Sequence, residues 1–150
     1  MERSESAVFT NMCMVRDGDR VLVINRNDPG WPGLAFPGGH VEKGEAFADS
    51  VIREVYEETG LTIEQPRLCG IKQFRTEEGS RYIVLLYRTD KFAGELISSG
   101  EGEVFWLTLE QLDQYPLTPH FEQVVEVMLR DELSEFFYDQ SGGGWVPVLK

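Results

Sequence analysis

Hydrophobic positions along the chain predict a series of short strands. Segments 7–15 and 20–25 are apolar runs joined by Asp17-Gly18-Asp19, which is typical of a hairpin turn. Segment 7–15 has apolar residues at neighbouring positions, which indicates burial on both faces and therefore a central strand. The other predicted strands are 34–36, 68–74, 81–88, 104–107 and 136–138, of which 68–74 and 81–88 form an antiparallel pair.

Two segments have the three- and four-residue spacing of amphipathic helices. The second of them covers 117–133. The first ends at Gly60, which predicts a left-handed helix end. Its apolar stripe consists of Ala48, Val51, Ile52, Val55 and Thr59. This combination of strands and helices predicts the α/β class, with a curved mixed sheet between helices in an α/β/α sandwich.

Length and charge restrict the class of protein. A chain of 150 residues forms one domain that buries about two-thirds of its unfolded surface. We expect a single domain over 1–150, with 141–150 as a flexible C-terminal arm after the glycines of 142–144. The net charge of −12 opposes binding to polymeric nucleic acid, which depends on cationic neutralisation of many phosphates. A small nucleotide remains feasible because metal ions can carry the positive charge to its phosphates.

The sequence shows no pattern typical of a membrane span or a targeting signal. Its longest apolar runs, such as 83–87, are far shorter than the roughly 20 residues of a membrane helix. Residues 1–6 lack the apolar core of a secretory signal. We therefore expect a cytoplasmic protein without a membrane partner, either a monomer or a homodimer. Cys13 and Cys69 fall within predicted strands, where a small buried hydrophobic residue is the expected role.

Three glutamates of the first helix share one face. Glu54, Glu57 and Glu58 are spaced i, i+3 and i+4, so their carboxylates project within a single turn. Like charges at this spacing destabilise an isolated helix by a few tenths of a kcal/mol per pair, roughly. A hard divalent cation would compensate them, and Mg²⁺ takes one or two carboxylates while leaving other positions to water and substrate phosphates. A solvated acidic face is the alternative.

The residues around the cluster form a longer motif. Gly39 is followed after five residues by Glu45, and after seven more by Arg53-Glu54-Val55-x-Glu57-Glu58-x-Gly60-Leu61. This spacing over 23 residues matches the Nudix box at every defined position. The chain therefore resembles the Nudix hydrolases, and from about residue 8 to 138 it looks most like the MutT-type nucleoside triphosphate pyrophosphohydrolases. The fold implied by this resemblance is the α/β/α sandwich predicted above.

The resemblance implies a metal-dependent active site. Mg²⁺ is the implied cofactor, with Mn²⁺ as the alternative ion. The implied metal ligands are the carbonyl of Gly38 and the carboxylates of Glu54, Glu57, Glu58 and Glu101. Glu54 is also the candidate base that takes the proton of the attacking water. Glu103 is the alternative to Glu101, and a solvated, mobile acidic loop over 98–103 would explain both.

Arg53 and Glu45 are expected to support the site. Arg53 lies four residues before Glu57 and can reach back to Glu45, so its implied role is to brace the glutamates. An ordinary surface arginine is the alternative. Glu45 lies near the helix start, where the helix dipole favours acidic residues in any case. Gly38 and Gly39 allow the backbone to approach metal and phosphate closely, unless they only form a tight turn.

The nucleoside pocket has weaker signals. His40 is a candidate phosphate contact, with a structural hydrogen bond as the alternative. Asn11, Phe36, Trp106 and His120 are candidates by position for stacking a purine or contacting its edge. Each of these four has core packing as its alternative. MutT-type enzymes that select 8-oxoguanine have an Asn or an acidic pair near segment 118–121, which this chain lacks.

Three functional hypotheses follow. The leading one is Mg²⁺-dependent hydrolysis of a nucleoside triphosphate, with 8-oxo-dGTP as a candidate, to the monophosphate and pyrophosphate. The second is hydrolysis of another nucleoside diphosphate derivative, such as ADP-ribose or a dinucleoside polyphosphate. Subfamilies with those activities have Pro or Tyr shortly after the box, where this chain has Glu77-Glu78-Gly79 with Tyr82 nearby. The third is a catalytically silent nucleotide-binding regulator, against which the complete glutamate set argues.

Overall fold

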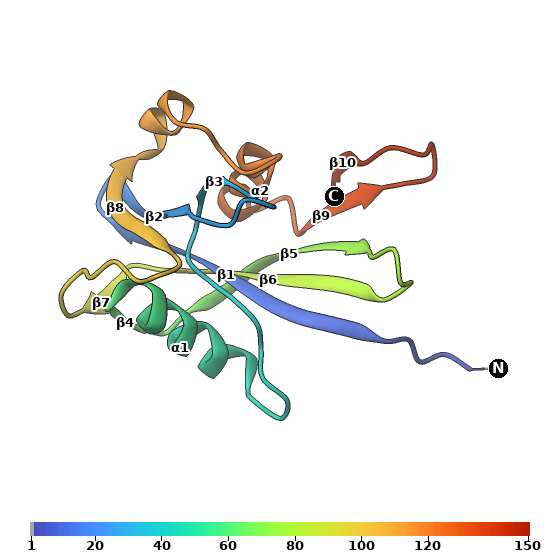
Figure 1. Cartoon of the computed structure of the whole chain (residues 1–150), viewed down its shortest axis with the longest axis horizontal. Coiled ribbons are helices and arrows are strands. Elements are labelled where there is room, and N and C mark those ends of the chain that lie inside the picture. Colours follow the sequence, from blue (N-terminus) through green and yellow to red (C-terminus); the bar gives the residue numbers. More distant parts are fainter. Residues whose placement is uncertain (1) are drawn as a thin grey trace.

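The main sheet is arranged around the long strand β1 (Ala7–Asp17), in a computed structural model that describes residues 2–150 (Figure 1). β1 pairs in parallel with β6 (Arg81–Thr89). It continues through a hairpin into the antiparallel β2 (Arg20–Arg26). Residues 12–15 are buried, although successive side chains of a strand point to opposite faces. This burial on both faces confirms the predicted central strand.

The remaining strands are β3 (Gly33–Ala35), β4 (Thr62–Glu64), β5 (Arg67–Arg75), β7 (Lys91–Ala93), β8 (Gly102–Thr108), β9 (Glu135–Asp139) and β10 (Val146–Leu149). The order of the main sheet is β10-β9-β5-β6-β1-β2-β3, and β8 pairs separately with β2. β5 and β6 are antiparallel, as predicted, whereas β5 and β9 are parallel. The short strands β4 and β7, which the sequence did not predict, form a second sheet.

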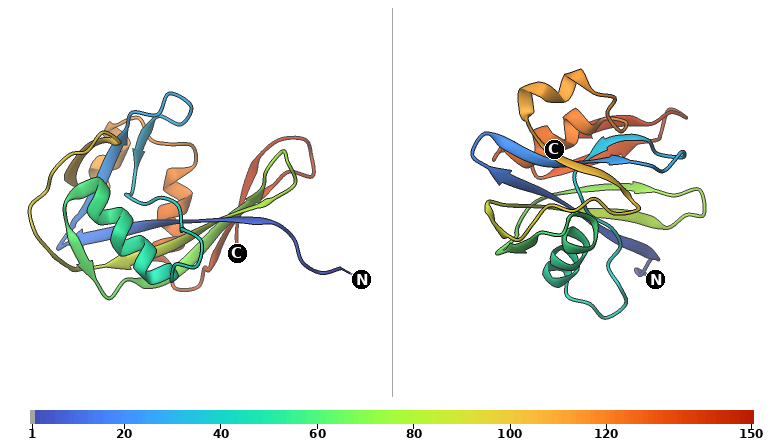
Figure 2. Two further views of the ribbon diagram at one scale, coloured as in Figure 1. Left: turned by 60° about the horizontal axis from the view of Figure 1, so that its bottom comes forward. Right: turned by 60° about the vertical axis from the view of Figure 1, so that its left-hand side comes forward.

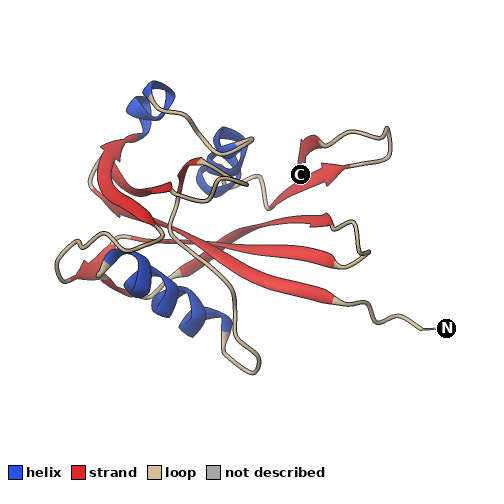
Figure 3. Ribbon diagram, in the orientation of Figure 1, coloured by secondary structure: helices blue, strands red, loops and turns tan. Residues whose placement is uncertain are grey.

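Helices cover both sides of the curved sheet (Figures 2 and 3). α1 (Phe47–Thr59) packs with Cys13 and Val15 of β1 in one hydrophobic cluster. α2 (Phe121–Leu129) packs with Met12 and Met14 in the other cluster, and the 3₁₀ helix η1 (Leu109–Gln114) contributes to that side. The alternation along β1 therefore separates the two cores and confirms the predicted α/β/α sandwich. None of the helices within residues 2–150 has the length and apolarity that crossing a membrane would require.

The second helix is shorter than the predicted 117–133. The N–H and the hydroxyl of Thr118 both donate to the carbonyl of Leu34 in β3, each at 3.1 Å. His120 then adopts a left-handed conformation with φ of 59°. Because this segment is bonded to β3, its backbone cannot continue the helix, and α2 begins only at Phe121.

The C-terminal arm is part of the sheet, so the prediction of a flexible arm over 141–150 is wrong for its last residues. Residues 146–149 pair antiparallel with β9. The carbonyl of Lys150 also accepts hydrogen bonds from the N–H groups of Ser134 at 2.7 Å and Glu135 at 3.0 Å. β9 needs partners for its backbone groups on this side, and the β-branched Val146 and Val148 are well suited to a strand.

Gly33 allows β3 to lie directly against the segment before α2. Its φ is 116°, and a Cβ atom there would lie 2.6 Å from the carbonyl carbon of Leu117. We expect Gly33→Ala to lower the free energy of unfolding by about 2–4 kcal/mol through backbone strain and overlap. A Cβ atom on Gly144 would meet nothing within 4 Å, so Gly144→Ala is the matched control. Equal urea midpoints for the two variants would contradict this explanation.

Candidate active site

Helix α1 carries the acidic face of the motif and packs against the sheet through its apolar side. Val51 and Val55 are fully buried, and Gly60 ends the helix with φ of 81°, as predicted. The predicted apolar stripe is only partly correct, because Ala48 is exposed and Ile52 is half-buried. In addition, one acid of the cluster is inside the protein, because Glu58 is only 3% exposed. The helix therefore holds a carboxylate in a partly dry environment.

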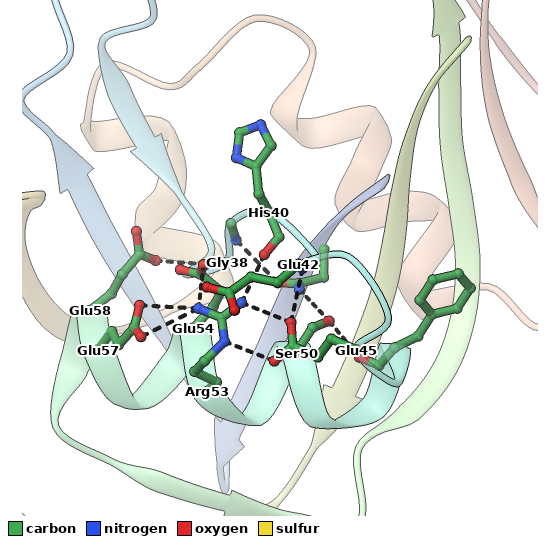
Figure 4. A network of polar contacts seen from close by, with 12 residues as sticks. Gly38, His40, Glu42, Glu45, Ser50, Arg53, Glu54, Glu57 and Glu58 are labelled. Atoms are coloured by element: carbon green, nitrogen blue, oxygen red, sulfur yellow. Dashed lines mark hydrogen bonds and ion pairs between the residues drawn. The ribbon is translucent and has the colours of Figure 1, made fainter. Parts of the chain in front are cut away.

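Arg53 gathers the carboxylates around one guanidinium (Figure 4). Its Nε donates to Glu45 at 2.8 Å, and its Nη1 donates to Glu54 at 2.9 Å and Glu57 at 3.3 Å. Its Nη2 donates to the carbonyl of His40 at 2.9 Å, which ties the loop before α1 to the helix. The hydrogen bonds from Arg53 lower the pKa of Glu45 to about 2. This geometry gives Arg53 and Glu45 the bracing arrangement expected from the sequence.

The protein neutralises the negative charges of Glu58 and Glu54 only in part. The Oε1 atom of Glu58 accepts a hydrogen bond from the Gly38 N–H at 2.7 Å, yet burial raises the pKa of Glu58 to about 7. Burial also raises the pKa of Glu54, although the hydrogen bond from Arg53 opposes this shift. A buried and a half-buried carboxylate this close together are compensated best by a bound cation.

The glycine turn fits closely against these carboxylates. A Cβ atom on Gly39 would overlap the carboxylate of Glu54, and one on Gly38 would overlap the carbonyl of Asn11. Gly39 is fixed to β1, because its carbonyl accepts from the Asn11 N–H at 2.8 Å. The two glycines are therefore required for backbone contact with the acidic cluster and do more than form a tight turn.

The donor set suits a hard divalent cation. Carboxylate and carbonyl oxygens are the ligands of Mg²⁺, which keeps several positions for water and phosphate. Within residues 2–150, no three acidic, histidine or cysteine side chains converge as a preformed metal site. Gly38, Glu54, Glu57 and Glu58 are the residues that would hold the ion, but the three carboxylates do not converge on one point. Glu57 is exposed and bonded to Arg53, whereas Glu58 accepts from the N–H of Gly38.

Two further charged residues adjoin the cluster. The charge of Glu101, in the loop before β8, contributes to the raised pKa of Glu58, whereas the charge of Arg26 opposes it. Glu101 is therefore close to the site. Its alternative Glu103 is paired with Asn25 across β8 and β2, and both glutamates are exposed. The Nε of Arg26 is buried without a hydrogen-bond partner in residues 2–150. Sequence reasoning missed Arg26, because an arginine at a strand end has no distinctive pattern.

A cavity of about 600 Å³ begins at the glycine turn and extends across the sheet. Its size is typical of a small-molecule site. Rings from distant parts of the chain form much of its wall: Trp31, Phe36, Phe74, Tyr82, His120, Tyr138 and Trp145. The cavity also contains one buried cation, Lys72, that the sequence did not indicate. Such a wall can stack a planar base.

Several residues predicted to bind the substrate, at its phosphates or its base, lie in or beside this cavity. His40 is exposed at its edge, and its ring lies 6.5 Å from that of Tyr82. His120 lines the cavity, with its Nδ1 2.8 Å from the hydroxyl of Tyr138. Phe36 contributes to the wall but is 1% exposed and packs edge-on against Phe121, so its main contacts are core contacts.

The structure places Asn11 and Trp106 differently from the sequence expectation. Asn11 uses its Oδ1 to accept from the Gly39 N–H at 3.1 Å and its Nδ2 to donate to Ser50 at 2.9 Å, so its amide braces the glycine turn. Trp106 does not line the cavity and instead packs against Phe92, with ring centroids 5.2 Å apart. Asn11 still lines the cavity, whereas Trp106 lies outside it.

Comparisons with known proteins agree with this site. A family model described as the NUDIX domain matches residues 8–128. An uncharacterized Nudix hydrolase, YvcI of Bacillus subtilis, is 31% identical over 125 residues, which are 80% of this chain and 78% of that protein. An ADP-ribose pyrophosphatase of Methanocaldococcus jannaschii is 31% identical over 98 residues, which are 65% of this chain and 58% of that protein.

Solved structures of similar proteins have the same fold as this chain. A MutT protein from Bacillus halodurans has a TM-score of 0.77 at 28% identity, over 95% of this chain and 97% of that one. A MutT Nudix hydrolase from Burkholderia pseudomallei has a TM-score of 0.70 at 25% identity, over 81% of this chain and 98% of that one. Because the family model covers most of the chain, including the glycine turn and the acidic face of α1, the chain belongs to the Nudix hydrolases, enzymes that act on pyrophosphate bonds of nucleoside-linked substrates.

Proposed function

We propose that this chain is a Mg²⁺-dependent hydrolase that cuts a nucleoside triphosphate into the monophosphate and pyrophosphate. The observation that carries the proposal is the position of the buried Glu58 and the half-buried Glu54 beside the glycine turn, at one end of an aromatic cavity. A nucleotide has both parts that this arrangement suits, a polyanionic chain and a planar base. 8-oxo-dGTP and the ordinary nucleoside triphosphates are the candidate substrates.

Each part of the site has a role in this reaction. When bound, Mg²⁺ would supply positive charge to the phosphates and acidify an attacking water. Glu54 is the proposed base, because burial raises its pKa toward the range in which a carboxylate accepts a proton more readily. Arg53 holds Glu54 and Glu57 in position, and the backbone at Gly38 and Gly39 allows close approach of a phosphate.

Hydrolysis of ADP-ribose or a dinucleoside polyphosphate is the second candidate. It is favoured by the resemblance to the archaeal ADP-ribose pyrophosphatase and by Tyr82, which lines the cavity. Residues 77–79, where those subfamilies have Pro or Tyr, lie in the hairpin between β5 and β6 and do not line the cavity. A panel of 8-oxo-dGTP, ordinary nucleotides, ADP-ribose and diadenosine tetraphosphate, compared by kcat/KM, would distinguish the two. A catalytically silent regulator would hydrolyse none of them.

The glutamate variants test the catalytic assignment. We expect Glu57→Gln and Glu58→Gln to lose most activity while remaining folded, because each removes a negative charge needed for the metal and relieves repulsion. Glu54→Gln should reduce kcat by about 10²–10⁴-fold. The control is Glu122→Gln on the exposed side of α2, which should keep full activity. Wild-type turnover of either Glu57→Gln or Glu58→Gln at saturating Mg²⁺ would refute the metal assignment.

Metal binding should stabilise the free protein. A ligand that binds the folded state alone adds about 2.7 kcal/mol at a hundred times its Kd. We therefore expect millimolar Mg²⁺ to raise the melting temperature of the wild type, and to release protons as it displaces them from the carboxylates. Glu58→Gln should show a smaller shift, measured by calorimetry with EDTA-treated protein as the baseline. A melting temperature indifferent to Mg²⁺ would contradict a site poised in the free enzyme.

The metal-free protein should lose stability as pH rises toward neutrality. Burial raises the pKa of Glu58 from 4.5 to about 7, so the folded state binds this proton more tightly than the unfolded state does. The stabilisation is complete below about pH 4.5 and lost as pH rises through about 7. We expect the unfolding free energy of the wild type, relative to Glu58→Gln, to fall by about 1–3 kcal/mol across this window. If urea titrations with EDTA give the same stability difference between wild type and Glu58→Gln at every pH, the raised pKa of Glu58 is disproved.

A further inference from the structure

Lys72 is a buried cation whose charge faces aromatic rings instead of an acid. It lies on β5, is 5% exposed, and lines the cavity. Its Nζ lies 5.1 Å from the ring centroid of Phe136, 5.3 Å from that of Tyr138 and 5.7 Å from that of Trp31. No hydrogen bond or ion pair joins this Nζ to another side chain within residues 2–150.

This environment leaves the ammonium group short of partners. Ring faces attract a cation, but they accept none of its three N–H groups as an oxygen atom would. Burial lowers the pKa of Lys72 to about 8, which agrees with the lack of an acidic neighbour. The only fully buried polar side-chain atom without a partner in residues 2–150 is Arg26 Nε, so the Nζ of Lys72 is accessible from the cavity that this residue lines. The missing acceptor is therefore expected on the ligand.

The position of Lys72 suits the far end of a nucleotide. Across the sheet, Thr10 of β1 lies opposite Val84 of β6, and Val84 lies opposite Lys72 of β5. Two strand spacings of about 4.8 Å place β5 about 10 Å from β1, to which the glycine turn is hydrogen-bonded through Asn11. A nucleotide whose phosphates lie at that turn would reach across this distance with its base. Lys72 would then meet the edge of the base.

The hydrogen-bond donors of Lys72 favour one kind of base edge. Lysine has three donors and no acceptor, so beside position 6 of a purine it can bond a keto oxygen but finds no acceptor in an amino group, although N7 of adenine or guanine can also accept from it. A second phosphate is a poor occupant, because one cation ringed by aromatic faces offers too few donors to replace its hydration. Arg26 also lies over Trp31, at 5.4 Å, but it comes from the end of β2 and its charge lowers the pKa of Glu58, so it is the cation nearer the acidic cluster.

We propose that Lys72 is a specificity-determining residue that donates a hydrogen bond to the keto oxygen of a 6-oxopurine base. The preferred substrates are then guanine-type nucleotides, including those of 8-oxoguanine, which share the 6-keto oxygen, and adenine nucleotides, which lack this acceptor, bind more weakly. This inference rests on the proposed function, since it assumes that the cavity holds the base of a nucleotide.

Binding of nucleoside monophosphates to the full chain in EDTA tests the inference without catalysis. We expect the wild type to bind GMP and IMP about 10–100-fold more tightly than AMP in isothermal titration calorimetry, the range of one hydrogen bond to a charged group. Lys72→Met keeps the side-chain length and removes the donor, so it should weaken GMP and IMP to the level of AMP and leave AMP unchanged. Lys91→Met, on the exposed strand β7, is the matched control and should keep the preference.

Each result of this experiment decides the question. Equal binding of GMP and AMP by the wild type would overturn the proposal. This test needs no variant, so it remains valid even if Lys72→Met folds poorly. Equal weakening of GMP and AMP in the variant would also overturn it, because Lys72 would then act on the phosphate. A lost GMP preference in a protein that hydrolyses no nucleoside triphosphate would support Lys72 and refute the proposed function. If the wild type hydrolyses nucleoside triphosphates but shows no base preference, the proposed function is supported and the role of Lys72 is refuted.

Discussion

The contact between Arg53 and three carboxylates is the interaction on which the site depends. Glu54 and Glu57 would otherwise repel each other on one helical turn, and the guanidinium joins both to Glu45. Its bond to the carbonyl of His40 also fixes the glycine loop relative to α1. Arg53 does not reach the buried Glu58, whose hydrogen bond comes from the backbone of Gly38. The negative charge left over is therefore concentrated beside the glycine turn, where a cation and a phosphate would meet.

The acidic face was predictable because it depends on local geometry. Positions i, i+3 and i+4 of a helix share a face whatever surrounds the helix, so the grouping of Glu54, Glu57 and Glu58 followed from spacing alone. Gly60 was likewise predictable as the helix end from its local position. The central strand was predictable because a strand buried on both faces has consecutive apolar residues. The burial of Glu58 was not predictable, because it depends on how closely the glycine turn approaches α1.

The cavity was harder to predict because strands far apart in the sequence build it. Trp106 and Lys72 illustrate the difficulty: each lies in a strand, and the face that its side chain occupies depends on register, which hydrophobic pattern alone does not fix there. Trp106 consequently packs on the α1 side with Phe92, while Lys72 enters the cavity between rings from β9 and the loop after β2. The flexible arm was mispredicted for a similar reason, since Val146 and Val148 become ordered only because β9 offers them a partner.

The distribution of charge explains how an acidic protein can hold an acidic ligand. The chain carries a net charge of −12, which repels nucleotides at long range, although salt screens this repulsion beyond about 8 Å. Inside the cavity the balance changes, because Arg26 and Lys72 both face aromatic rings there without an acidic partner within 4.0 Å among residues 2–150. One cation lies toward the carboxylates and the other toward the far wall. A nucleotide bound between them would therefore be oriented by charge at its phosphate end and by hydrogen bonding at its base.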